Sequence, residues 1–115
     1  MWRLLNEPSI GFEANAWYGT LFYPHKLRND IDKMLFLHEC GHLVFDHKRH
    51  KEHNFDIIIQ QEEIAWEYAV KIAKKMRLNV SYEFIDFCLT TYYLQYNMCD
   101  DNKTILDTWK QAYST

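Results

Sequence analysis

Residues 30–46 read DIDKMLFLHECGHLVFD, and this stretch decides the fold expected for the chain. Asn29 or Asp30 is a good N-cap, because a short polar side chain can accept a hydrogen bond from the first turn of a helix. Apolar residues recur at helical spacing, namely Ile31, Met34, Leu35, Leu37, Leu43, Val44 and Phe45. The pattern predicts a well-buried helix.

The same helix carries two histidines four residues apart, His38 and His42, with Glu39 directly after the first. Residues at i and i+4 of a helix differ by about 40° in rotation and about 6 Å in rise, so both imidazoles project toward a shared point. Zinc binds His nitrogens at about 2.0 Å and, in catalytic sites, keeps a fourth position for water. Glu39 then has the place of the general base in the HExxH pattern of zinc hydrolases.

A third zinc ligand must come from elsewhere in the chain. The subclass of these enzymes with a third histidine six residues after the second is excluded, because Lys48 stands there. Three glutamates on the next expected helix remain available, Glu62, Glu63 and Glu67. Glu62 shares a stripe with several alanines, whose small side chains permit close approach to the first helix. Glu62 is therefore the favoured ligand, with Glu63 as the alternative.

The two motifs together resemble the ImmA/IrrE type of metallopeptidase, whose pattern is HExGH followed by ExxA and then an aromatic residue before alanine. The matching residues are His38, Glu39, Gly41, His42, Glu62, Ala65, Tyr68 and Ala69, and the likeness spans roughly residues 14–76. The chain departs from the family at Trp66, where Asn or Asp is common. Residues 72–76 also replace the usual Leu-Leu-Met-Pro ending of that helix.

This resemblance implies a gluzincin-like minimal protease fold. It implies that zinc is held by His38, His42 and a glutamate, and that Glu39 is catalytic. It further implies that the substrate is a repressor or regulatory protein in bacteria or mobile elements, often beside a DNA-binding partner.

Three further helices are expected. Residues 60–76 repeat apolar positions at helical spacing and form the clearest amphipathic helix. Residues 81–97 fit a helix capped by Ser81, and residues 104–113 fit a short last helix. The polar sequence HKRHKEHN, residues 47–54, lacks apolar periodicity. It is expected to be a solvated loop, because its histidines alternate with cationic side chains that would oppose a metal ion.

Residues 14–24, ANAWYGTLFYP, are rich in aromatic side chains. They predict one strand or a tight hairpin that turns near Gly19 and Thr20, the only β segment expected. The fold class is therefore α+β and mostly helical, with a short strand or hairpin packed on a body of three to four helices that carries the HExxH helix. The 115 residues are expected to form one domain.

A net charge of −3 favours neither nucleic acid nor an acidic membrane as a partner. The three cysteines, an odd number without CxxC spacing, predict no disulfide framework. No stretch has the length of a signal peptide's apolar region or of a membrane span. A cytoplasmic location is expected.

Candidates for stabilising an oxyanion are less well defined. His25 beside Pro24 is one, although a histidine near a turn is more often a surface group. Four tyrosines carry suitable hydroxyls without any feature that selects among them, Tyr82, Tyr92, Tyr93 and Tyr96. The predicted strand could also bind a peptide by edge addition.

Together these features predict a zinc metallopeptidase that hydrolyses a peptide bond, with Zn²⁺ on His38, His42 and Glu62 and with Glu39 as the base. The expected partner is a protein or peptide substrate, including a DNA-binding regulator. The alternative is a non-catalytic interaction or inhibitor protein, of phage or mobile-element type, that keeps a zincin scaffold. A metal-free helical domain packed tightly at Gly41 is the third interpretation, and it predicts no stoichiometric zinc.

Overall fold

The polar residue before each helix sets where that helix begins. The computed structural model describes residues 2–50 and 54–95, with side chains to residue 92, and three helices and three strands lie within them. Helix α1 (Asp30–Val44) begins where the Asn29 side chain accepts a hydrogen bond from the Asp32 N–H at 2.8 Å. The helix predicted over residues 30–46 is present, and Asn29 is its cap.

Helix α2 (Phe55–Lys75) begins earlier than the predicted residue 60. The Asn54 side chain caps it by accepting the Ile57 N–H at 3.0 Å, and Phe55 is buried, so the first turn is both capped and packed. Helix α3 (Tyr82–Gln95) follows Ser81, whose hydroxyl accepts the Phe84 N–H at 3.2 Å. The helix predicted at residues 104–113, which would be the fourth, lies outside the described residues.

The sheet contains β1 (Arg3–Asn6), β2 (Glu13–Asn15) and β3 (Thr20–Tyr23), in the order β1-β3-β2. Antiparallel β2 and β3 form the predicted hairpin, and Gly19 adopts a positive φ of 61° immediately before β3. Strand β1 pairs with β3 in parallel. The prediction of a single β segment was therefore wrong. All four residues of β1 are exposed, so it lacks the alternation of buried and exposed positions that identifies a strand.

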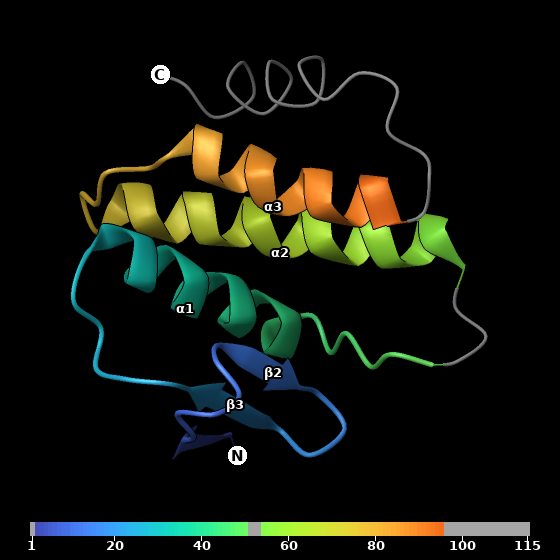
Figure 1. Ribbon diagram of the computed structural model, residues 1–115, viewed down its shortest axis with the longest axis horizontal. Coiled ribbons are helices and arrows are strands. Elements are labelled where there is room, and N and C mark those ends of the chain that lie inside the picture. The colour runs from blue at the N-terminus through green and yellow to red at the C-terminus, as the bar shows by residue number, and fades with distance from the viewer. Residues whose placement is uncertain (1, 51–53, 96–115) are drawn as a thin grey trace.

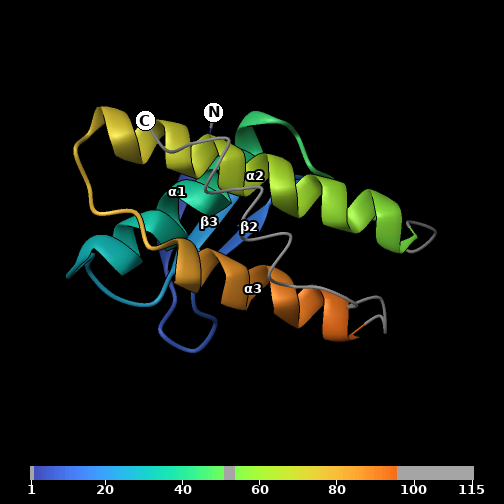
Figure 2. The same cartoon turned by 90° about the horizontal axis from the view of Figure 1, so that it is seen from above.

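The elements are stacked in layers, with α1 between the sheet and α2 (Figure 1). Helix α3 packs against α2, and α1 and the strands lie beneath these two helices in the view from above (Figure 2). The architecture is thus a compact α+β fold. None of the described helices is both long and apolar enough to cross a membrane.

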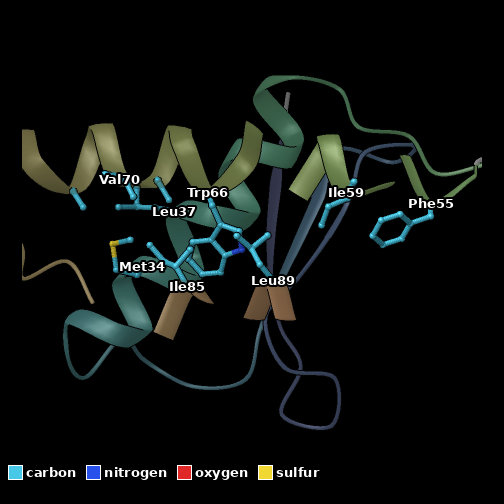
Figure 3. Packing of buried hydrophobic residues seen from close by; sticks show 10 residues of the cluster. Met34, Leu37, Phe55, Ile59, Trp66, Val70, Ile85 and Leu89 are labelled. Atoms are coloured by element: carbon cyan, nitrogen blue, oxygen red, sulfur yellow. The ribbon is translucent and has the colours of Figure 1, made fainter. Parts of the chain in front are cut away.

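The hydrophobic core lies where the three helices meet. Trp66 of α2 is only 1% exposed and lies close to Ile85 and Leu89 of α3, as Figure 3 shows. The full cluster is Met34, Leu37, Phe55, Ile59, Trp66, Ala69, Val70, Ala73, Ile85 and Leu89. Residues of α1, α2 and α3 all belong to this cluster. Their packing fixes the position of α2 relative to α1, and therefore the positions of side chains at the interface of these two helices.

Candidate metal centre

Three buried side chains that can bind a metal converge between α1 and α2. His38 Nε2 lies 3.2 Å from His42 Nε2 and 3.1 Å from Glu62 Oε1. The second oxygen, Glu62 Oε2, lies 2.8 Å from His42 Nε2. All three residues are at most 7% exposed. This group could hold a metal ion, because it presents two imidazole nitrogens and a carboxylate at one point.

The two helices approach closely because Gly41 faces Ala65. A Cβ at position 41 would stand 2.9 Å from the Ala65 carbonyl oxygen and 3.0 Å from its Cα. Glu62 lies one turn before Ala65 on α2, so this approach brings its carboxylate to the histidines of α1. Glu63, the alternative ligand, does not belong to the buried group found among the described residues.

The spacing of the donor atoms fits a tetrahedral ion. Four donors at about 2.0 Å from a shared ion are about 3.3 Å from one another. Two separations are close to that value, 3.2 Å between the two Nε2 atoms and 3.1 Å from His38 Nε2 to Glu62 Oε1. The third, 2.8 Å from His42 Nε2 to Glu62 Oε2, is shorter. Burying three polar groups of this kind is unfavourable unless they are paired or share a cation.

The charges in this group support one another. Burial acts to lower the pKa of His38, but the adjacent Glu39 and Glu62 carboxylates outweigh it and raise that pKa to about 9. Burial acts to raise the pKa of Glu62, but hydrogen bonds and charges from His38 and His42 hold it well below its usual range. Glu62 is therefore an ionised carboxylate, the form in which a carboxyl group can bind a metal.

Glu39 lies beside the donors without joining them. Its Oε2 accepts a hydrogen bond from the Ala14 N–H of β2 at 3.0 Å. Its Oε1 lies 3.2 Å from His38 Nδ1, although that nitrogen makes no well-directed hydrogen bond within the described residues. The strand thus orients the carboxylate, and each oxygen has two lone pairs, so capacity to accept a proton remains.

A cavity of about 440 Å³ adjoins the site. Its lining comes from the segment before β2, from β2 itself, from α1 and the loop after it, and from α2 and α3: Ile10, Phe12, Glu13, Ala14, Glu39, His42, His47, Arg49, Glu62 and Tyr92. The candidate base and two of the candidate ligands therefore face one space that a ligand could enter.

Residues 47–50 form a loop, as predicted, and Arg49 and His50 are exposed. The prediction missed that this loop also contacts the candidate site. Arg49 Nη2 donates to Glu62 Oε2 at 2.6 Å. His47 Nδ1 lies 3.0 Å from His42 Nδ1. The indole N–H of Trp17, in the hairpin turn, donates to the Arg49 carbonyl at 3.2 Å. Nothing in the polar composition of the loop signalled these contacts, because they depend on how the hairpin and α2 are placed.

Two of the four tyrosines considered as oxyanion donors, Tyr82 and Tyr92, have described side chains. Tyr92 of α3 lines the cavity, whereas Tyr82 lies in a separate hollow with Val80 and Glu83. Burial, followed by the charge of Glu62, raises the pKa of Tyr92 to about 12, so its hydroxyl keeps its hydrogen and can donate. The Tyr93 side chain and Tyr96 lie outside the described part of the chain.

His25 does not face the cavity. Its ring nitrogens lie 2.9 Å from the Arg28 guanidinium and 2.9 Å from the Lys26 carbonyl oxygen. It therefore belongs to the polar cluster before α1, as expected of a surface histidine.

Trp66, where the chain departs from the ImmA/IrrE pattern, stacks on the imidazole of His38. The ring centroids are 4.1 Å apart and the planes are inclined by 16°. An Asn or Asp here could accept a hydrogen bond from a ligand, but an indole cannot. Trp66 instead confines the His38 ring by contact.

Comparison of the chain with known protein families, with curated proteins and with solved structures found no match.

Proposed function

We propose that the protein is a zinc metallopeptidase, with His38, His42 and Glu62 as ligands and Glu39 as the catalytic base. The observation that carries the proposal is the convergence of two Nε2 atoms and one carboxylate in a buried group. Zinc is the metal inferred, because a set of imidazole and carboxylate donors with near-tetrahedral spacing suits it. The resemblance of residues 38–42 and 62–69 to the ImmA/IrrE pattern supports the same conclusion.

The roles of the residues follow from their positions. A zinc ion held there would act as a Lewis acid that acidifies water and polarises the scissile carbonyl. Glu39, which faces the cavity, accepts the proton from the attacking water and delivers it to the leaving amine. The Ala14 N–H holds the carboxylate in place during both transfers. Tyr92 and Arg49 also line the cavity and carry donors that can stabilise negative charge on the carbonyl oxygen.

The substrate class proposed is a peptide segment of a regulatory or repressor protein in the cytoplasm, and it rests on the family resemblance. A cavity lined by an edge strand supports a peptide, because β2 ends the sheet. Main-chain groups at this edge other than the Ala14 N–H, which Glu39 occupies, can pair with an extended segment.

The test measures zinc content and cleavage on the full chain. We expect one zinc ion per chain by elemental analysis and hydrolysis of an unbiased peptide mixture, read by mass spectrometry. Glu39→Gln keeps the ion and loses cleavage by about 100-fold or more, because the amide cannot accept the proton. Glu63→Gln, which alters the neighbouring carboxylate outside the buried group, keeps both. Absence of stoichiometric zinc, or full cleavage by Glu39→Gln, contradicts the proposal.

A non-catalytic interaction protein is the second candidate. It is favoured by the bond from the Ala14 N–H to Glu39, since a carboxylate that ties β2 to α1 has a structural use without any reaction. In that case zinc binds and no peptide is cut by the unaltered chain. Glu39→Gln would then change only the free energy of unfolding.

A further inference from the structure

We propose that His47 is a positioning residue of the metal centre, which accepts a hydrogen bond from the His42 Nδ1–H and thereby fixes the tautomer in which His42 Nε2 faces the metal. This inference rests on the metal-binding part of the proposed function. It does not depend on whether the protein cuts peptides.

The two ring nitrogens of His42 contact different partners. Its Nε2 points into the donor group, 2.8 Å from Glu62 Oε2 and 3.2 Å from His38 Nε2. Its Nδ1 points the other way and lies 3.0 Å from His47 Nδ1. His47 is therefore the residue that contacts the side of His42 remote from the candidate ion.

The hydrogen in this contact can be assigned from the chemistry of imidazole. Two ring nitrogens 3.0 Å apart make a hydrogen bond only when one carries the hydrogen and the other a lone pair. Nε2 of His42 needs its own lone pair to bind a metal, so the ring hydrogen of neutral His42 lies on Nδ1. Nδ1 of His47 is then the acceptor. A partner on the remote nitrogen is how metal-binding histidines are commonly held.

The backbone at the end of α1 places His47 over His42. The His47 N–H donates to the His42 carbonyl at 2.8 Å, and the Asp46 N–H donates to the Leu43 carbonyl at 3.1 Å. Asp46, the residue before His47, has a left-handed φ of 54°. This pair of bonds is a Schellman motif, which turns the chain back over the last helical turn. The His47 side chain consequently returns to a residue five positions earlier.

The His47 ring is also confined on its other side. Its plane stacks on Phe45, with centroids 5.9 Å apart and an inclination of 22°. The loop that carries it is attached to the hairpin, since Trp17 donates to the Arg49 carbonyl. The His47 ring is thus held by His42 and Phe45, and its loop by the hairpin, before any ion binds, which is what a positioning residue requires.

The affinity of the full chain for zinc, measured by competition with a chromophoric chelator, tests the proposal. We expect His47→Leu to weaken zinc binding by about 10- to 100-fold, the range typical when a ligand loses its outer partner. His47→Asn should stay close to the unaltered chain, because its Oδ1 can occupy the place of Nδ1 and accept the same hydrogen. His50→Asn is the matched control, since it alters a histidine of the same loop whose ring meets Trp17.

A merely structural His47 gives a different result. Thermal unfolding of the metal-free variants separates the two, because a structural role predicts that His47→Leu and His47→Asn lose stability while zinc affinity is unchanged. The proposal is overturned if all variants bind zinc with equal affinity, or if His47→Leu and His47→Asn lose zinc affinity equally.

A second measurement covers the case in which His47→Leu does not fold. In the zinc-loaded unaltered chain, ¹H–¹⁵N correlation of the histidine rings should show the His42 hydrogen on Nδ1. A hydrogen on Nε2 overturns the proposal, as does a chain that binds no zinc. A chain that binds zinc tightly but cuts no peptide refutes the proposed hydrolysis and leaves the role of His47 standing.

Discussion

Glu62 is a carboxylate only 2% exposed, held between two histidines and the Arg49 guanidinium. We predict that Glu62→Gln abolishes stoichiometric zinc binding, because the amide is a weaker donor and carries no charge to offset the ion. The loss should exceed the roughly 10- to 100-fold effect of an outer partner. Elemental analysis of purified variants measures it, with Glu63→Gln as control. Equal zinc in both variants would show that Glu62 is not a ligand.

Asp32 is a buried carboxylate of α1 that does not belong to the candidate metal group. Its Oδ2 accepts from the Arg28 backbone N–H at 3.0 Å and from Arg28 Nε at 3.2 Å, and His25 Nδ1 lies 3.7 Å away. Burial acts to raise its pKa, but the hydrogen bonds and charge of Arg28 outweigh burial, so the pKa is lowered. A carboxyl whose pKa is lower in the folded protein stabilises it above the unfolded value of 3.8.

This pKa shift predicts a pH-dependent effect of Asp32→Asn. The variant should be less stable at neutral pH by at most about 1 kcal/mol, the upper end for ion pairs with an exposed partner, because Arg28 is largely exposed. The difference should shrink as the pH falls below the unfolded value of 3.8 and vanish below the lowered pKa. Urea unfolding at a series of pH values measures it. Asp56→Asn is the control, because it also removes one charge at the start of a helix. A stability difference between Asp32→Asn and the unaltered chain that does not depend on pH would contradict the lowered pKa of Asp32.

At the scale of elements, the contact of α1 with α2 decides whether a site can form. We predict that Gly41→Ala destabilises the fold by about 1–3 kcal/mol from overpacking. The higher helix propensity of alanine, about 1 kcal/mol, offsets only part of this. The new Cβ would meet backbone atoms of Ala65, which cannot rotate away as a side chain would.

The same substitution should also weaken zinc binding, because separating α2 from α1 carries Glu62 away from His38 and His42. Chemical unfolding and chelator competition measure the two effects. Cys40→Ala, at the adjacent half-buried position of α1, is the control and should change neither strongly. If Gly41→Ala is more stable than the original chain and binds zinc normally, the close approach does not limit the site.

At the scale of the whole molecule, a metal ion would join α1 to α2 across the layer interface. Any ligand that binds only the folded state stabilises it by mass action, about 2.7 kcal/mol at a hundredfold excess over Kd. We therefore predict that zinc raises the thermal unfolding midpoint by several degrees and that a chelator reverses the rise. Calorimetry of the full chain measures this, with magnesium as control ion. The same rise in Glu62→Gln would place the stabilising metal elsewhere.

The sequence by itself determined what short-range patterns encode. Apolar spacing and a polar cap defined α1, and the i, i+4 relation placed His38 and His42 on one face of it. The stripe of small residues on α2 correctly marked Glu62 as the carboxylate that approaches them. Each of these inferences needs only helix geometry and the chemistry of the side chains.

Only the tertiary structure decided the rest. Four features join segments that share no local pattern: the pairing of β1 with β3, the contact of Arg49 with Glu62, the return of His47 to His42 and the position of Tyr92 at the cavity. A polar loop and an exposed strand carry no periodicity that reports on such partners. Their positions follow from the packing of α2 on α1 and of the hairpin on the loop after α1. This packing exists only once the hydrophobic core has formed.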